Sequence, residues 1–196
     1  PVPGGITAPT SHVDLIPTLL GLAGIDLERA TEGVRQRHTE AQPLPGRDLS
    51  GVITGREAAA TLDAPIYFMT EDAVTRGLTQ RNVLSGDPFE SLEAAACIES
   101  VVAELPTGAD GAGELWKLNH YYERLDDWYA DHGVAPDPFA APAAEPSWEL
   151  HNLTRDPEER ANLAGQAGDE QSRLQTLLEA QREEKRLLPS LRNPTT

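Results

Sequence analysis

The chain has 196 residues, and 32 acidic against 16 basic side chains give it a formal net charge of −16. Nucleic acids and anionic membrane surfaces attract clustered Lys and Arg, whereas this chain has only Lys117 and Lys185, with Arg scattered among carboxylates. This balance excludes nucleic-acid binding as the main activity. Because 39% of the residues are hydrophobic, the chain can build the core of one ordinary domain, or of a domain with an appendage.

The single cysteine, Cys97, excludes an intrachain disulfide and a zinc site made of Cys pairs. The longest apolar-rich stretch, Val13–Ile25, is interrupted by Asp14 and Pro17, and it is far shorter than the roughly 20 apolar residues that cross a bilayer. We therefore expect no membrane span, and no signal-peptide pattern is present. The Pro/Gly-rich run Pro1–Gly5 is typical of a connector, so we expect the true N-terminus to lie elsewhere.

The first predicted element is a short, largely buried helix within Ser11–Gly24, extending over residues 14–24. Ser11 or Asp14 can cap it, Pro17 needs no hydrogen-bond donor in the first turn, and Gly24 can take the left-handed conformation that ends it. Its Leu and Ile residues recur at helical intervals on more than one face, so they require a partner to cover them. The stretch from residue 26 to residue 50 has mixed charges and loop punctuation without a clear period, which predicts an irregular surface segment.

The middle of the chain predicts strands. Apolar or alternating runs, bounded by turn residues, favour strands at four places: Pro65–Thr70, Ile98–Leu105, Glu114–Tyr122 and Ser147–Leu153. The second and third flank the glycine-rich loop Pro106–Gly113 and predict an antiparallel hairpin. In the third, the two-residue side-chain period places Lys117, Asn119 and Tyr121 opposite Trp116, and we expect the Trp116 face to face the core.

Two helices are expected at the end of the chain. Asp156 followed by Pro157 is a strong helix start, for a short helix that ends before Gly165. A longer helix is predicted over Asp169–Leu188, and its single apolar stripe favours packing on the chain's own sheet over a partner-binding role. The predicted fold class of this chain is α+β, with a small antiparallel sheet of about four strands and a C-terminal helix.

Candidate residues for chemistry each have a structural alternative. Cys97 has no local His and is favoured as a small buried hydrophobe. Ser11, His12 and Asp14 invite a triad or metal-site reading, yet neighbours in sequence are not neighbours in geometry, so helix capping is favoured. The other histidines show no metal-ligand spacing: His38, His120, His132 and His151.

Charged residues near the strands are the remaining candidates. Glu71 and Asp72 follow a strand end, where they can bind a cation or a substrate hydroxyl, or form a solvated turn. Arg76 and Lys117 are candidates for binding an anionic group, although an exposed strand position is favoured for Lys117. No glycine-rich phosphate-binding loop occurs. Composition and spacing alone therefore identify no active site.

Three segments resemble, in the same order along the chain, parts of the C-terminal region of a sulfatase: Ser11–Ile25, Pro45–Leu49 and Trp148–Ala164. They are similar to the family's "shvDlxPTlLxlaGi" helix, its "GrSL" turn and its "xELYDLxxDPxExxNLA" segment. Asp48 stands where the family has Ser, and His151 with Asn152 where it has Tyr-Asp. Further similarity lies in Pro65–Glu71 and Gly113–Tyr122, whereas residues 27–42, 80–96 and 126–145 look like family-variable insertions.

The resemblance implies a parent with a large α/β domain of the alkaline-phosphatase type and a smaller C-terminal subdomain. Residues 1–56 would be the end of the large domain, with the 14–24 helix plus loops, and residues 57–196 the small subdomain. Family chemistry uses a formylglycine made within a Cys/Ser-x-Pro-x-Arg motif and a divalent cation, usually calcium. Cys97–Ser100 is not that motif, and the family's metal ligands precede Ser11. The resemblance therefore assigns no catalytic or metal-binding residue in this chain, and the substrate-binding residues stay unknown.

The expected function is that of the C-terminal portion of a sulfuric ester hydrolase acting on a small-molecule sulfate ester. This chain would supply the small subdomain and part of the pocket rim, would be inactive alone, and leaves homo-oligomerisation open. Two alternatives remain: a phosphodiesterase or phosphonate hydrolase of the same superfamily, or a free-standing, non-catalytic binding module.

Overall fold

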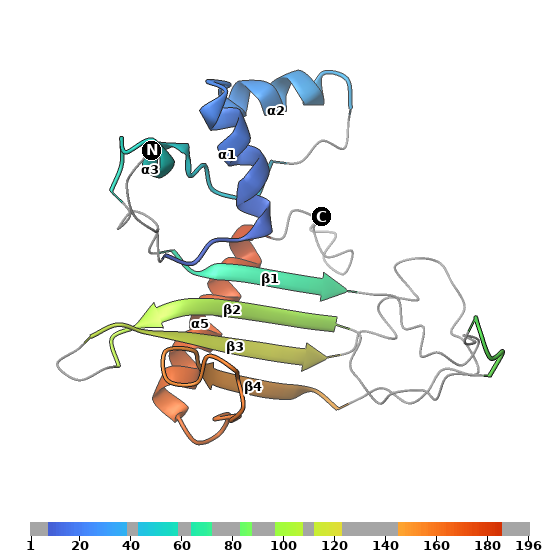
Figure 1. Cartoon of the computed structure of the whole chain (residues 1–196), viewed down its shortest axis with the longest axis vertical. Helices are drawn as coiled ribbons and strands as arrows, with labels where there is room; N and C mark the ends of the chain where they lie inside the picture. Colours follow the sequence, from blue (N-terminus) through green and yellow to red (C-terminus); the bar gives the residue numbers. More distant parts are fainter. Residues whose placement is uncertain are drawn as a thin grey trace, which may run out of the picture. The chain divides into compact units, whose positions relative to one another are not determined.

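The structure, a computed structural model, describes residues 8–38, 43–58, 64–71, 83–87, 97–107, 112–122 and 145–185. The chain divides into two compact units, which are Pro1–Ile66 with Ala180–Pro189 and Tyr67–Glu179 with Ser190–Thr196. The first unit is helical and the second is built on a sheet (Figure 1). The fold class is α+β, as predicted, whereas the domain boundary between residues 56 and 57 stays a prediction.

In the described part of its N-terminal segment, the first unit contains a 3-10 turn and three helices: η1 (His12–Asp14), α1 (Leu15–Leu22), α2 (Leu27–Arg35) and α3 (Ser50–Ile53). The predicted first helix is present and ends close to its predicted stop. Gly24 follows it with a φ of 70°, the left-handed conformation that glycine adopts without a Cβ clash.

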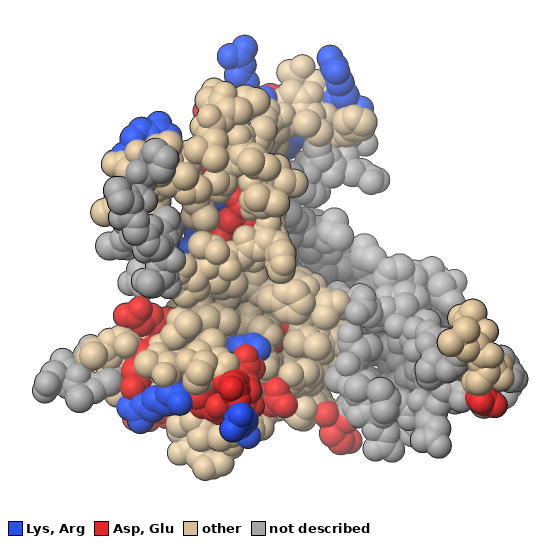
Figure 2. All heavy atoms as spheres, in the orientation of Figure 1, with Lys and Arg blue, Asp and Glu red and all other residues tan. Residues whose placement is uncertain are grey.

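The expectation that the first helix is largely buried is wrong within this chain. Only Pro17 and Thr18 of α1 are buried, whereas Leu15, Ile16 and Leu19 are 61%, 55% and 56% exposed. Leu22 completes this apolar face, which is defined by Leu15, Ile16, Leu19 and Leu22, at positions one helical turn apart. Figure 2 shows the surface over α1 as mostly uncharged. The described residues therefore leave this apolar face exposed to solvent.

The expectation of an irregular segment after residue 26 is also wrong, because α2 forms there. The carboxylate of Asp26 accepts a hydrogen bond from the backbone amide of Arg29 at 2.7 Å and caps the helix. Glu28 in the first turn and Arg35 in the last match the helix dipole. No residue of α2 is buried, but its apolar residues do recur at helical spacing from Leu27 to Val34, a signal for a helix that the sequence interpretation missed.

The second unit is a four-stranded sheet with the order β1-β2-β3-β4, comprising β1 (Ile66–Glu71), β2 (Cys97–Leu105), β3 (Glu114–Tyr122) and β4 (Ser147–Asn152). Its arrows alternate in direction in Figure 1. The register of the central hairpin runs from Cys97 opposite Tyr122 to Leu105 opposite Glu114. All four predicted strands are confirmed, with ends shifted by a residue at most.

The core lies between one face of this sheet and the last helix, α5 (Gly168–Lys185), which crosses behind the sheet in Figure 1. Leu174 and Leu178 of α5 are buried among apolar strand residues: Val101, Ala103, Leu105, Trp116, Leu118 and Leu150. The Trp116 face is therefore the core face, as predicted, and the apolar stripe of the helix packs on the chain's own sheet. Residues 186–188 of the predicted helix lie outside the described residues.

The short helix expected at Asp156 does not form. The segment Arg155–Ala164, here called the strap, instead lies along β4, where the Leu163 amide donates to the Leu150 carbonyl at 2.8 Å. The Asp156 carboxylate accepts from the Ala161 amide at 2.9 Å, five residues ahead, and so closes a wider turn than a helix cap would. β4 is an edge strand, so its outward backbone groups can form hydrogen bonds with the strap. The signals for a helix start depend on neighbouring residues only and cannot predict such a long-range pairing.

Candidate functional site

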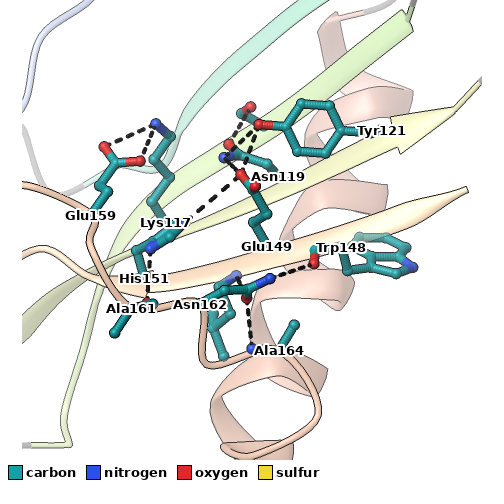
Figure 3. Close-up of polar contacts among 12 residues, drawn as sticks. Lys117, Asn119, Tyr121, Trp148, Glu149, His151, Glu159, Ala161, Asn162 and Ala164 are labelled. Carbon is teal, nitrogen blue, oxygen red and sulfur yellow. Dashed lines mark hydrogen bonds and ion pairs between the residues drawn. The ribbon is translucent and has the colours of Figure 1, made fainter. Parts of the chain in front are cut away.

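The face of the sheet opposite α5 carries a row of polar side chains from β3 and β4 (Figure 3). Lys117 lies opposite His151 and Asn119 opposite Glu149 in the strand register, and Tyr121 follows on the same face of β3. Asn119 and His151 are each only 4% exposed. Buried and half-buried polar residues thus meet charged ones on one surface, which makes this polar face the candidate site.

Glu149 is the centre of this group. Its Oε2 atom accepts a hydrogen bond from the Tyr121 hydroxyl at 2.8 Å and one from Asn119 Nδ2 at 3.3 Å. Asn119 Oδ1 in turn accepts from the Ser100 hydroxyl at 2.7 Å, which extends the network to β2. Each of these bonds joins two strands or two neighbouring positions on one strand, so the network fixes the side chains of the polar face.

These contacts determine the protonation states. Burial by itself raises the pKa of the Glu149 carboxyl, but hydrogen bonds from Tyr121 and Asn119, with His151 nearby, hold that pKa below its ordinary value. Burial, followed by the adjacent Glu149 carboxylate, raises the pKa of Tyr121 to about 12. At neutral pH Tyr121 is therefore a hydrogen-bond donor and Glu149 an anion. Their polar atoms are directed at each other, which is the arrangement of a structural network and not of a nucleophile with its base.

A second carboxylate network closes the other end of β3. Glu114, 8% exposed, accepts hydrogen bonds from Arg155 Nε at 2.7 Å, from Asn152 Nδ2 at 3.0 Å and from the Thr107 hydroxyl at 2.9 Å. The bond from Arg155 is the largest cause of a lowered pKa of the Glu114 carboxyl. This network connects the hairpin loop to the turn that follows β4.

These two carboxylates predict an acid-labile fold. Both have a folded-state pKa below the 4.5 of an unperturbed glutamate, so their stabilisation is complete above pH 4.5 and is lost as the pH falls through the folded-state value. The free energy of unfolding, measured by urea titration between pH 7 and pH 3, is expected to decline below pH 4.5. Glu149→Gln should flatten part of that decline, and an unchanged acid profile in this variant would contradict the role of Glu149.

The strap is fastened to the polar face by side chains. Lys117 Nζ contacts both carboxylate oxygens of Glu159, at 2.8 and 3.0 Å. The Nδ1 atom of His151 lies 3.1 Å from the carbonyl oxygen of Ala161, which can only accept, so Nδ1 carries the proton. Asn162 bridges the strap to β4 twice, because it accepts from the Leu150 amide at 3.0 Å and donates to the Trp148 carbonyl at 3.1 Å. Lys117 therefore serves an internal ion pair, at a position that is only partly exposed.

Glu159 combines this ion pair with an unusual backbone. Its φ of 54° is the only positive value of a non-glycine residue in the described part of the chain, and such a conformation costs about 1 kcal/mol for a residue with a Cβ atom. Glu159→Ala removes the partly exposed ion pair and keeps the strain, whereas Glu159→Gly removes both. We expect the glycine variant to be about 1 kcal/mol more stable than the alanine variant in urea unfolding. Equal stability of the two variants would show that the backbone at this position is not strained.

The first unit has its own polar clamp, around Asp14, which is 3% exposed. Its carboxylate accepts from the Arg47 amide at 2.7 Å, from Arg47 Nη2 at 3.0 Å and from the Ser11 amide at 3.0 Å. Burial opposes the charge, but these hydrogen bonds hold the pKa of Asp14 below its ordinary value. Thr18 adds a bond, because its hydroxyl accepts from the Leu49 amide at 3.0 Å. The clamp fixes α1 to the segment that precedes α3.

Glycine makes this close approach possible. A Cβ atom at Gly46 would overlap the Val13 carbonyl and lie 2.7 Å from the Asp14 amide, and one at Gly21 would overlap the Asp48 carboxylate. Asp48 also accepts from the amide of Ser50, the first residue of α3, at 2.8 Å. The Pro45–Leu49 turn is therefore held in place by contacts that require Gly21 and Gly46 and by the hydrogen bonds of Asp14, Arg47 and Asp48.

The triad or metal-site reading of Ser11, His12 and Asp14 is not supported by their positions. Asp14 contacts the Ser11 backbone amide and not its hydroxyl, and its remaining bonds go to Arg47. His12 is exposed. The favoured capping role is confirmed, because Ser11 and Asp14 form a capping box at the start of η1 in which the Asp14 carboxylate accepts from the Ser11 amide at 3.0 Å.

The remaining candidates are also placed. Cys97 is 3% exposed at the start of β2, in agreement with the expected small buried hydrophobe. His120 stacks between Trp148 and Tyr122, with ring centroids 4.0 and 4.9 Å away, and His38 is exposed. Asp72, Arg76 and His132 lie outside the described residues, and so does the side chain of Glu71.

Among the described residues, no group of three or more His, Cys, Asp or Glu is arranged to hold a metal ion. In the same residues, no helix is long and apolar enough to cross a membrane. The residues that organise the polar face were missed as a group by sequence reasoning. Alternation along β3 places Asn119 and Tyr121 beside Lys117, but their partners Glu149 and Glu159 are identified only by the pairing of distant segments.

No protein-family model matches the chain, and no curated protein is significantly similar to it. One similar solved structure is described as BT4656 in complex with its substrate D-glucosamine-2-N,6-O-disulfate. The two share 18% sequence identity with a TM-score of 0.47, over 88% of this chain and 24% of that one. This chain thus spans about a quarter of the length of the structure that it matches.

Proposed function

We propose that this chain is the C-terminal portion of a sulfatase, an enzyme that hydrolyses a sulfate ester, and that it supplies the small subdomain and part of the pocket rim. One observation carries the proposal. Polar residues of the three motifs, which follow one another along the chain in the family's order, make defined contacts within each unit.

In the first unit, the Asp of the first motif and the Gly-Arg of the second form the clamp. Asp14 and Arg47 are 33 positions apart in sequence and meet through two hydrogen bonds, one of them charge-assisted. Gly46 provides the space that this contact requires. A chance match to either motif would not be expected to bring these residues together, so their contact supports the resemblance.

In the second unit, the third motif builds the strap. Asp156, Glu159 and Asn162 occupy the D, E and N of the family's "DPxExxNLA" pattern, and each makes a defined contact. The partner of Glu159 is Lys117, which lies in the strand that resembles the family's "yKl" segment. Two segments recognised separately in the sequence are thus joined by one ion pair.

The chemistry is proposed to lie outside this chain. The described residues offer no cluster that fits a divalent cation, and Cys97 does not stand in a formylglycine motif. No catalytic step is therefore assigned to these residues, and the isolated chain is expected to be inactive. The uncovered apolar face of α1 is consistent with attachment to a larger body, because exposed apolar patches mark interaction surfaces.

The decisive experiment begins with the coding DNA upstream of Pro1, read in frame for a Cys/Ser-x-Pro-x-Arg motif and an Asp-Asn metal loop. The full-length product is then assayed with p-nitrophenyl sulfate, bis-p-nitrophenyl phosphate and a p-nitrophenyl phosphonate, and mass spectrometry tests the motif for formylglycine. Sulfate ester hydrolysis with formylglycine is the expected result. Preferred hydrolysis of the diester or phosphonate would replace the proposal with the related hydrolase, and an in-frame stop with a nearby start codon would make the chain a free-standing module.

A simpler measurement tests attachment through α1. The isolated chain is expected to bind a hydrophobic dye or to aggregate, and Leu19→Lys, at a position that is 56% exposed, should reduce both. Leu84→Lys, at a position that is 97% exposed outside α1, is the matched control and should change neither. A monomeric chain that binds no dye would count against a covered α1 face.

A further inference from the structure

Asn152, Leu153 and Thr154 form the pattern Asn-x-Thr, the acceptor sequence for N-linked glycosylation. It is the single usable acceptor sequence of the chain, because the only other Asn-x-Thr pattern, at Asn193, has proline in the middle. Such acceptors normally lie on surface loops, where the glycan extends into solvent. In this fold the acceptor lies at the end of β4 instead.

The Asn152 side chain makes three hydrogen bonds. The residue is 3% exposed, and its Nδ2 atom, to which a glycan would be attached, donates to the buried Glu114 carboxylate at 3.0 Å. Its Oδ1 atom accepts from the amides of Thr154 and Arg155, both at 3.1 Å, and so closes the turn after β4. The amide cannot rotate towards solvent without the loss of all three bonds.

Thr154, the second recognised residue, is engaged as well. Its hydroxyl accepts from the Leu115 amide at 2.8 Å and ties the turn to β3. The folded chain therefore buries the acceptor amide of Asn152 and engages the hydroxyl of Thr154, which lies at an exposed turn position.

We infer that Asn152 is a modification site at which glycosylation and folding of the second unit exclude one another. Asn152 can accept a glycan only before β3 and β4 pair, and a glycan there prevents that pairing. The donor would be a lipid-pyrophosphate-linked oligosaccharide. Nδ2 loses a proton and bonds to the first sugar carbon, while the bond of that carbon to the lipid pyrophosphate breaks and the lipid pyrophosphate leaves. Glycosylated chains then lose the Asn152 contacts and leave the buried Glu114 with one donor fewer, which is costly.

The test is to secrete the chain, with Leu19→Lys to reduce aggregation through α1, from yeast behind a cleavable signal and to measure glycan occupancy at Asn152 in the soluble, protease-resistant fraction and in the insoluble fraction. Occupancy is expected to be at least tenfold lower in the soluble fraction. Leu84→Thr, which completes an acceptor sequence at Asn82 beside two almost fully exposed residues, is the positive control and should be glycosylated in the soluble fraction.

A destabilised core keeps the test decisive. Leu118→Ala leaves the acceptor sequence intact and should raise total occupancy at Asn152, because the chain spends longer unfolded. Equal glycan occupancy in both fractions of the chain that keeps Leu118 would overturn the inference. Absence of glycan from both fractions of Leu118→Ala would overturn it too, since the unfolded chain would then not be an acceptor.

Discussion

Gly46→Ala is expected to cost the first unit about 3 kcal/mol of folding stability, as an overpacked site at its upper range does. The new Cβ atom would overlap the Val13 carbonyl and lie 2.7 Å from the Asp14 amide, and both of these are backbone groups that cannot rotate away. To make room, the Pro45–Leu49 turn must retreat, and the hydrogen bonds between Asp14 and Arg47 are then lost.

The measurement for this variant is hydrogen exchange of the α1 amides, combined with thermal unfolding followed by far-ultraviolet circular dichroism. Gly33→Ala provides the matched control. Gly33 lies within α2 and has open space around its missing Cβ, so alanine should stabilise that helix by about 0.5–1 kcal/mol. A Gly46→Ala protein with wild-type protection of α1 would refute the close packing of the clamp.

Leu118→Ala is expected to destabilise the second unit by about 3 kcal/mol. Leu118 is 0% exposed at the centre of the core face of β3, among Val101, Leu150 and Leu174. Truncation removes apolar contacts and leaves a cavity. β3 cannot move to close it, because it is hydrogen-bonded to β2 on one side and to β4 on the other. Because a domain of this size has a total stability of roughly 5–15 kcal/mol, the loss is a large fraction of it.

Urea unfolding followed by tryptophan fluorescence reports on this variant directly, since Trp116 and Trp148 lie in the same unit. Leu84→Ala is the control, because Leu84 is 97% exposed and should change the free energy of unfolding by less than about 0.5 kcal/mol. Should both variants unfold at the same urea concentration, Leu118 would not be a core residue.

The motif residues of both units make structural contacts. Asp14, Gly46 and Arg47 in one unit, and Glu159 and Asn162 in the other, are used to close turns and to fix distant segments. Asp14 is buried and requires defined partners, and few substitutions satisfy the same geometry. The identity of these residues is therefore informative about the fold.

The sequence by itself determined the local structure of this protein. Alternation in Glu114–Tyr122 identified the core face, the glycine-rich loop placed the hairpin, and the leucine spacing after Asp169 identified α5. These features depend on neighbouring residues, because strand and helix periods are local properties of the chain. The α+β class follows from them.

Only the tertiary structure decided the outcomes that depend on distant partners. The Asp156 signal predicted a helix, but the segment that follows it pairs with the edge of β4 as the strap. The pairing of Glu149 with Tyr121, and of Lys117 with Glu159, depends on strand register and on a turn after β4. Such contacts join residues far apart in sequence, so no local pattern encodes them, and the polar face became visible only when the sheet was assembled.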